Sequence, residues 1–249
     1  MSRRGRENKE MEKEKEKEKE KESVPESASN SPQSNINIYL FYANIMDYFR
    51  VVLSMFSFYI AKTQPVLFVI SYFISFILDA FDGMVARAYD QESKLGATLD
   101  MVTDRISTAG LLCVLSGFYR DWSTAFVYLI MLDVGSHWLQ THSGLIVDPN
   151  SVNHKNLGEN FLVLRLYYTN RNCLGIVCLG AELYLLLLYL NHFYKFDNIC
   201  FTALLYLNFV IYCYKQFVSI LQIFGAGARI GGFDEKHALE KAANKKKSS

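Results

Sequence analysis

Four aspartates interrupt two neighbouring apolar segments of the chain: Asp79, Asp82, Asp100 and Asp104. The first two are three residues apart and the last two are four apart, so each pair lies on one face of a helix. Because only a short turn joins the two segments, they should run antiparallel. Asp82 then comes level with Asp100, and Asp79 with Asp104, so we expect the four carboxylates to converge in one small volume.

Clustered carboxylates in apolar surroundings need cationic partners. Each one at the centre of a membrane helix costs about 2.5–3.5 kcal/mol on insertion scales. Arg87 and Arg105 are too few to neutralise four acids, whereas hard divalent cations with oxygen ligands can do so. Gly83 and Gly96 leave room for a polar ligand beside the acids. The pattern predicts a Mg²⁺ or Mn²⁺ site that handles a phosphate group and opens to the cytosol.

Six long apolar segments follow a polar N-terminal stretch. They run roughly over 45–61, 65–87, 95–119, 123–142, 173–193 and 198–224. Each is long enough for a helix to cross some 30 Å of hydrocarbon. We therefore expect an all-α, polytopic membrane protein with six transmembrane helices, preceded by a short interfacial helix at Ile36–Tyr42. A soluble helical bundle is the disfavoured alternative, because this part of the chain has too little polar surface to cover itself.

Composition divides the chain into three parts: a disordered Lys/Glu-rich tail (1–37), the six-helix membrane domain (38–230) and a basic C-terminal tail (231–249). Six crossings place both termini on one side, and the loops rich in Lys and Arg fall on that side, so both tails are expected in the cytosol. The ending Lys246-Lys247-Ser248-Ser249 resembles a dilysine retrieval signal. It favours the endoplasmic reticulum membrane, with the Golgi as the alternative.

Composition also limits the partners. A formal net charge of +1 disfavours nucleic-acid binding and leaves the lipid bilayer as the expected partner. Five scattered cysteines in a chain this long exclude a secreted disulfide scaffold. A metal-ion transporter remains an alternative, because six spans with buried acids could form an ion path. The position of the acids toward one end of the spans, without an internal repeat, argues against it.

The acids belong to a longer pattern of fixed residues: Asp79-x-x-Asp82-Gly83-x-x-Ala86-Arg87, eight residues, then Gly96-x-x-x-Asp100-x-x-x-Asp104. This pattern resembles the signature of the CDP-alcohol phosphatidyltransferases, with every fixed position filled. The similarity extends over roughly residues 37–230. It implies a six-helix membrane fold, a homodimer and two bound ions of Mg²⁺ or Mn²⁺.

The resemblance also implies the reaction. A phosphatidyl group would pass from CDP-diacylglycerol to myo-inositol with release of CMP, as a step of phospholipid biosynthesis. Serine, glycerol phosphate, choline and ethanolamine are the alternative acceptors within the family. The four aspartates would hold the metal ions, and Asp104 would in addition take the proton of the acceptor hydroxyl.

The resemblance assigns further residues to the two substrates. Those expected at CDP-diacylglycerol are Asn44, Gly83, Ala86, Arg87 and Gly96. Those expected at the acceptor are Asp133, His137, Lys155, Arg165 and Arg171. Other interpretations stay open for the acceptor set: Asp133 and His137, four residues apart, can pair within one helix. The arginines can contact lipid headgroups or enforce the orientation of the protein in the membrane.

Overall fold

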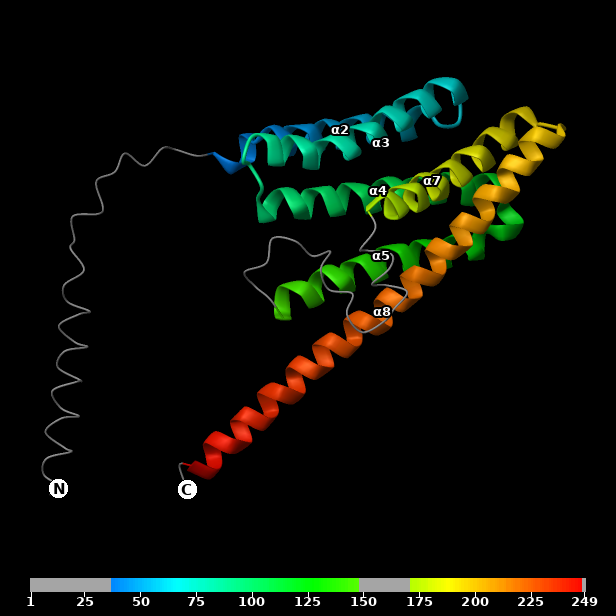
Figure 1. Cartoon of the computed structure of the whole chain (residues 1–249). Helices are drawn as coiled ribbons and strands as arrows, with labels where there is room; N and C mark the ends of the chain where they lie inside the picture. Colours follow the sequence, from blue (N-terminus) through cyan, green and yellow to red (C-terminus); the bar gives the residue numbers. More distant parts are fainter. Residues whose placement is uncertain (1–36, 148–170, 248–249) are drawn as a thin grey trace, which may run out of the picture. The chain divides into compact units, whose positions relative to one another are not determined.

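The structure, a computed structural model, describes residues 37–147 and 171–247. Within them it contains α-helices, two short 3-10 turns and no strand. The helices are α2 (Tyr42–Ile60), α3 (Pro65–Ala88), α4 (Lys94–Phe118), α5 (Ser123–Val147), α7 (Arg171–Tyr194) and α8 (Ile199–Lys247), shown in Figure 1. The 3-10 turns are Ile38–Leu40 and Arg120–Trp122. The all-α prediction is confirmed, and each predicted apolar segment corresponds to one of these helices.

Many large apolar side chains lie on the surface of the helices. Met55, Tyr59, Tyr128 and Ile199 are among those that are exposed, and extended apolar surface of this kind marks a membrane or partner contact. Within the described residues, α3, α7 and α8 are long and apolar enough to cross a membrane. The other three helices fall short because charged and small polar residues interrupt them. These features are those of a helical membrane protein, and the six crossings stay a prediction.

Helix α4 contacts three other helices of the bundle. It packs against α2, α5 and α7, while α2 also packs along α3, and α8 packs along α5 and α7 (Figure 1). The segments α3 and α4 run antiparallel, as predicted, but they make few direct backbone contacts, because α2 packs against both. The sequence predicted a pair of helices, α3 and α4, whereas in the structure α2, α3 and α4 form a group of three.

Short hydroxyl side chains join α2 to its two neighbours. Ser54 of α2 lies with its Oγ 3.2 Å from that of Ser75 on α3 and 3.1 Å from that of Ser107 on α4. Ser57 donates a hydrogen bond of 2.7 Å to Ser71. Small residues at membrane helix interfaces allow close packing and supply hydrogen bonds where lipid offers none. The serines therefore explain why α2 can approach both helices.

The apolar core lies at the opposite end of α4 from the aspartates. Its buried members are Ile60, Ala61, Phe68, Tyr72, Leu111, Leu112, Leu115, Phe126, Ala181, Leu185, Leu186, Tyr189 and Tyr212. Tyr189 links three helices there: its ring centroid is 4.2 Å from that of Phe68, and its hydroxyl donates to the carbonyl of Ala61 (2.6 Å). The second half of α4 is thus anchored in apolar packing, which holds its first half in position for the acids.

The turn between α3 and α4 is fixed by local hydrogen bonds. Ser93 caps α4 by accepting from the backbone N–H of Gly96 (3.0 Å). Asp90 ends α3 in a left-handed conformation, with a φ of 54°. The side chain of Gln91 accepts from the backbone N–H of Tyr42 (3.0 Å). These contacts bring the start of α2, the end of α3 and the start of α4 together, which is where the aspartates lie.

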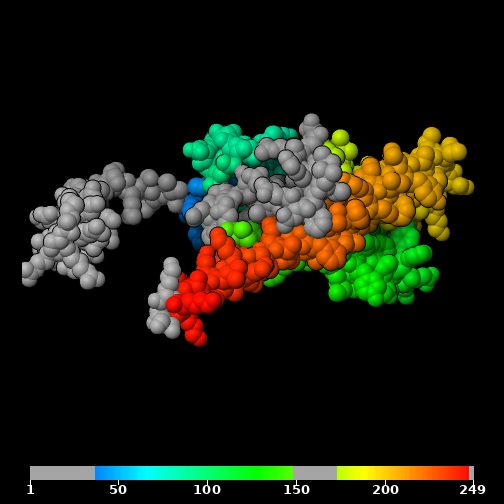
Figure 2. All heavy atoms as spheres, turned by 60° about the horizontal axis from the view of Figure 1, so that its bottom comes forward, coloured from blue at the N-terminus to red at the C-terminus, as the bar shows by residue number. Residues whose placement is uncertain are grey.

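The two chain ends differ in how far the structure describes them. Of the interfacial helix predicted at Ile36–Tyr42, the described part forms one 3-10 turn, and α2 then begins at Tyr42. Helix α8 continues through the predicted C-terminal tail to Lys247, with exposed side chains that run across one face in Figure 2. Residues 1–36 and the last two serines of the dilysine-like ending lie outside the described residues. The disorder of the N-terminal tail, the cytosolic location of both termini and the location in the endoplasmic reticulum stay predictions.

Candidate functional site

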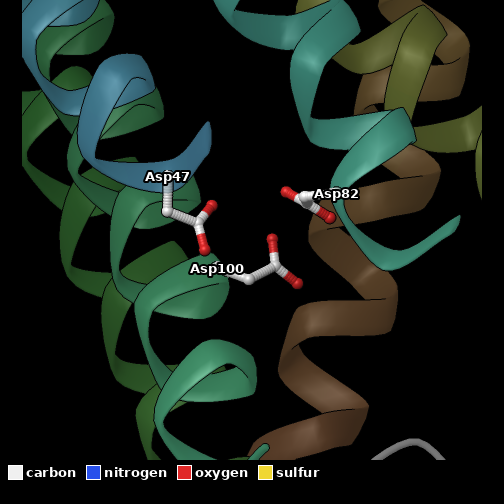
Figure 3. A group of neighbouring side chains, drawn as sticks. All are labelled: Asp47, Asp82 and Asp100. Carbon is white, nitrogen blue, oxygen red and sulfur yellow. The ribbon is translucent and has the colours of Figure 1, made fainter. Parts of the chain in front are cut away.

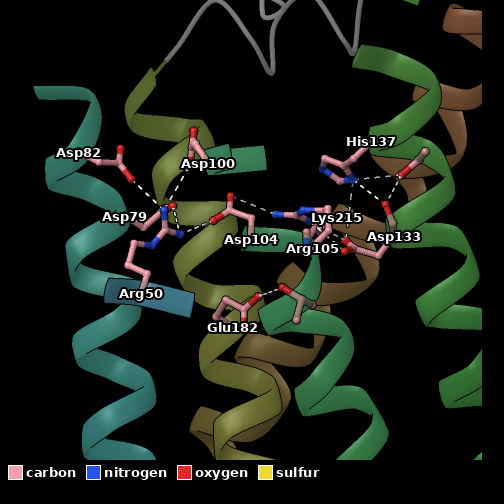
Figure 4. Close-up of polar contacts among 12 residues, drawn as sticks. Arg50, Asp79, Asp82, Asp100, Asp104, Arg105, Asp133, His137, Glu182 and Lys215 are labelled. Atoms are coloured by element: carbon pink, nitrogen blue, oxygen red, sulfur yellow. Dashed lines mark hydrogen bonds and ion pairs between the residues drawn. The ribbon is translucent and has the colours of Figure 1, made fainter. Parts of the chain in front are cut away.

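One guanidinium group lies at the centre of the acid cluster. Arg50 of α2 donates hydrogen bonds to five carboxylates: Asp47 (2.8 Å), Asp79 (2.5 Å), Asp82 (2.8 Å), Asp100 (3.4 Å) and Asp104 (2.6 Å). Figure 4 shows four of these acids around it. The convergence of the four motif aspartates is confirmed. Sequence reasoning missed Asp47 and Arg50, because it sought partners only on the two helices that carry the motif.

The carboxylates form two groups that could each hold a cation. Oxygen atoms of Asp47, Asp82 and Asp100 lie within 4.8 Å of one another, and the same holds for Asp79, Asp100 and Asp104. Figure 3 shows the first group directed toward a common space from α2, α3 and α4. One Nη atom of Arg50 donates to the three acids of the first group, and the other Nη atom donates to Asp79 and Asp104 of the second. Hard oxygen ligands of this kind could hold a divalent cation. The number of ions and the choice of Mg²⁺ or Mn²⁺ stay predictions.

Arg105 connects the cluster to another buried acid. It contacts Asp104 (3.3 Å) and both oxygens of Asp133 (3.0 and 2.9 Å). Asp133 is 2% exposed and also accepts from Lys215 of α8 (3.1 Å). Six aspartates therefore share three cations in these contacts: Arg50, Arg105 and Lys215. The excess of negative charge is a physical reason for divalent cations to bind here.

Two cavities border the acid cluster. The smaller cavity, of about 290 Å³, is lined by all five residues predicted at CDP-diacylglycerol: Asn44, Gly83, Ala86, Arg87 and Gly96. The larger cavity, of about 560 Å³, extends to Tyr72 of α3, Thr108 of α4 and Glu182 of α7. Three aspartates line both cavities: Asp82, Asp100 and Asp104. The two cavities therefore meet at these aspartates.

The glycine at position 96 has a packing role in addition to the predicted one. A Cβ atom on Gly96 would lie 2.7 Å from Oδ1 of Asn44 and 3.2 Å from Oγ of Ser93. The Asn44 amide is itself held, because it donates to the carbonyl of Ile38 (2.7 Å). Only a residue without a side chain therefore lets Asn44 reach α4 at the mouth of the smaller cavity.

Gly96→Ala is expected to destabilise the protein by about 1–3 kcal/mol, because the new methyl group displaces the Asn44 side chain. Thermal unfolding of the purified protein in detergent measures this effect. Gly135→Ala is the matched control: an added Cβ there meets nothing within 4 Å, and alanine favours the helix. A Gly96→Ala protein as stable as the control variant would contradict the packing role.

Two of the five residues predicted at the acceptor have side chains that the structure describes, His137 and Asp133. His137 lines the smaller cavity, with its Nδ1 2.8 Å from the carbonyl oxygen of Asp133. Asp133 borders neither of these two cavities. Its carboxylate is paired with Arg105 and Lys215, which favours a structural role for Asp133 over contact with the acceptor. The other three predictions lie outside what the structure describes: Lys155, Arg165 and the side chain of Arg171.

Sequence reasoning also missed the polar wall of the larger cavity. Glu182 is buried at 9% exposure, and Lys215 at 5%. A signal was present, because Glu182 is the single charged residue of the apolar run 173–194. An isolated acid in a membrane helix marks a functional position. Its location beside the aspartates depends on packing between helices far apart in the sequence.

Comparison with known proteins extends over the same part of the chain. The sequence model of the family described as CDP-alcohol phosphatidyltransferase matches residues 40–225. This range contains the acid cluster and the lining of both cavities. The chain belongs to the CDP-alcohol phosphatidyltransferase family.

Several members of the CDP-alcohol phosphatidyltransferase family resemble the chain over most of its length. It is 36% identical over 219 residues to the CDP-diacylglycerol–inositol 3-phosphatidyltransferase of Saccharomyces cerevisiae, covering 86% of this chain and 98% of that protein. It is 37% identical over 209 residues to the Homo sapiens protein of the same name, covering 82% and 98%. The corresponding Candida albicans protein is 36% identical over 210 residues, covering 84% and 90%. No solved structure matches the chain.

Proposed function

We propose that the protein transfers the phosphatidyl group of CDP-diacylglycerol to myo-inositol and releases CMP. The observation that carries this proposal is the aspartate cluster of the family signature, whose members line the two cavities. The names of the relatives support inositol over serine, glycerol phosphate, choline or ethanolamine. They also support an enzyme over a metal-ion transporter.

The smaller cavity is the proposed site of the cytidine and diphosphate. Asn44, Gly96 and Arg87 line it, and the guanidinium of Arg87 lies close to Gly83. A guanidinium group pairs with two phosphate oxygens at once. The acyl chains of the donor would remain in the bilayer, along the exposed apolar faces of the helices.

The motif aspartates are the proposed metal ligands: Asp79, Asp82, Asp100 and Asp104. Two ions of Mg²⁺ or Mn²⁺, when bound, would neutralise the diphosphate and stabilise the charge that develops on the leaving CMP. Asp47 extends this ligand set, because its carboxylate belongs to one of the two groups.

Asp104 is the proposed general base, since it borders both cavities. A free alcohol is a poor nucleophile at neutral pH, so a base within hydrogen-bond reach is needed. Asp104 takes the hydroxyl proton of inositol as that oxygen attacks the phosphorus of the phosphatidyl group. The bond from this phosphorus to the bridging diphosphate oxygen breaks, and CMP leaves with the bonding electron pair.

The proposal includes the setting of the enzyme. We place it in the endoplasmic reticulum membrane, with six crossings, cytosolic termini and a homodimeric assembly. The distribution of Lys and Arg along the chain supports the orientation. The three strongly apolar helices support membrane insertion. The cytosolic side then receives the water-soluble substrate and CMP.

Transfer activity tests the function directly. Full-length protein in lipid nanodiscs, supplied with CDP-diacylglycerol and labelled myo-inositol, is expected to form labelled lipid and one CMP per lipid. EDTA should abolish the product, and Mg²⁺ or Mn²⁺ should restore it, because the excess carboxylates need cations. Lipid formed from serine but not from inositol would show that inositol is not the acceptor. Metal flux without lipid product would indicate a transporter, and full activity in excess EDTA would reject the metal site.

A further inference from the structure

The larger cavity contains a buried carboxylate that the metal site does not use. Oε1 of Glu182 accepts a hydrogen bond from the hydroxyl of Thr108 (2.6 Å), and Oε2 accepts one from Tyr72 (3.0 Å). Figure 4 shows Glu182 on α7, apart from the aspartates. A carboxylate buried among apolar helices is unfavourable unless hydrogen bonds or cations satisfy it. The two hydrogen bonds that it accepts here come from neutral hydroxyls, and the charge of Arg105 also acts on it. Such a group requires a functional explanation.

Polar side chains connect the aspartates to Glu182 along two helices. Thr108 follows Asp104 by four residues on α4, so it lies on the same face, about 6 Å further along the helix. Tyr72 precedes Asp79 by seven residues on α3, or about two turns. All of these residues line the larger cavity. The cavity therefore extends from the site of chemistry to Glu182 along a hydroxyl-bearing wall.

The wall of this cavity offers both kinds of hydrogen-bonding group. Glu182 only accepts hydrogen bonds and Lys215 only donates them, whereas the hydroxyls of Ser75, Ser107 and Thr108 do both. Its volume of about 560 Å³ is in the range of small-molecule sites. A neutral compound with several hydroxyl groups matches this mixed set. A free phosphate would be repelled by Glu182 beside the aspartates.

We infer that the larger cavity holds the neutral polyol acceptor, and that Glu182, oriented by Tyr72 and Thr108, accepts hydrogen bonds from its hydroxyl groups. This inference rests on the proposed function and names the acceptor site within it. Donor and acceptor then meet at the aspartates that line both cavities. One acceptor hydroxyl reaches Asp104 while others bind Glu182, so Glu182 determines acceptor affinity and does not act as the base.

Glu182→Gln in the full-length protein tests this assignment. The variant keeps the shape of the side chain and removes its charge. We expect the KM for myo-inositol to rise about tenfold or more, because hydrogen bonds to a charged group are the stronger ones. The KM for CDP-diacylglycerol should change less than about twofold. Tyr72→Phe should also raise the KM for myo-inositol, since Glu182 loses one of the groups that orient it.

A matched control separates this role from general packing. Tyr189→Phe removes another buried tyrosine hydroxyl, which bonds the carbonyl of Ala61 away from both cavities, and should leave both KM values unchanged. Wild-type protein that makes no lipid from myo-inositol refutes the proposed function. If the wild type is active, two results for Glu182→Gln would refute the inference and leave the proposed function intact. One is an unchanged KM for myo-inositol, and the other is an equal rise in the KM values for both substrates. If that variant does not fold, the same criteria applied to Tyr72→Phe decide.

Discussion

Replacing Asp104 by asparagine is expected to lower lipid transfer by about 10²–10⁴-fold, the usual contribution of a general base. Asparagine has the shape of aspartate and can still accept a hydrogen bond from Arg50, but it cannot take a proton. Binding of the donor should persist, because asparagine keeps the shape of Asp104 and the other residues lining the smaller cavity are unchanged. Single-turnover release of CMP measures the chemical step, and equilibrium binding of labelled CDP-diacylglycerol measures the affinity.

The control for Asp104→Asn is the same substitution at an aspartate outside the site. Asp121, exposed in the short turn Arg120–Trp122, is such a residue, and Asp121→Asn should transfer lipid at the wild-type rate. An Asp104→Asn enzyme that turns over normally would show that another group acts as the base. Loss of donor binding together with turnover would instead assign Asp104 to binding.

Arg50→Leu is expected to have the largest effect on stability. Five carboxylates share the Arg50 guanidinium, and Arg50 is 2% exposed. Removing one partner of a buried ion pair costs about 3–5 kcal/mol, because the opposite charges remain buried. The variant should therefore unfold at a lower temperature in detergent, or fail to accumulate in membranes.

Two further measurements distinguish lost charge from lost packing. Arg50→Lys keeps the charge but has a single ammonium in place of the forked guanidinium, so an intermediate loss of stability is expected. Mg²⁺ should raise the unfolding temperature of Arg50→Leu more than that of the wild type, because a ligand bound only by the folded state stabilises it. Wild-type stability of Arg50→Leu without any divalent cation would contradict the role of Arg50 as the shared counter-charge.

Local pattern was sufficient to predict the helices and the meeting of the acids. The length of each apolar run predicted one helix, because a helix advances a constant distance per residue. The spacing of Asp79 from Asp82, and of Asp100 from Asp104, predicted one face on each helix. The turn between these segments then predicted that they run antiparallel, which they do, although α2 packs against both and they make few direct contacts. The same residues also carried the family resemblance, which the family match confirms.

Contacts between residues far apart in the sequence could not be predicted from the spacing within one or two segments. Arg50 precedes Asp104 by 54 residues, and Tyr72 precedes Glu182 by 110 residues. Periodicity specifies which face of a helix is polar, but it does not specify which other helix covers that face. The packing of α2 against both α3 and α4 decided that Arg50 lies among the acids.

The sequence by itself determined the membrane class, the helical elements and the acid site, since each follows from length, spacing or residue type within one or two adjacent segments. Tertiary structure alone decided which cation lies among the acids, why Gly96 has no side chain and where Glu182 lies. These properties depend on the approach of separate helices, through small residues such as Ser54 and the buried core around Tyr189. Packing of that kind is a property of the whole bundle, and no single segment encodes it.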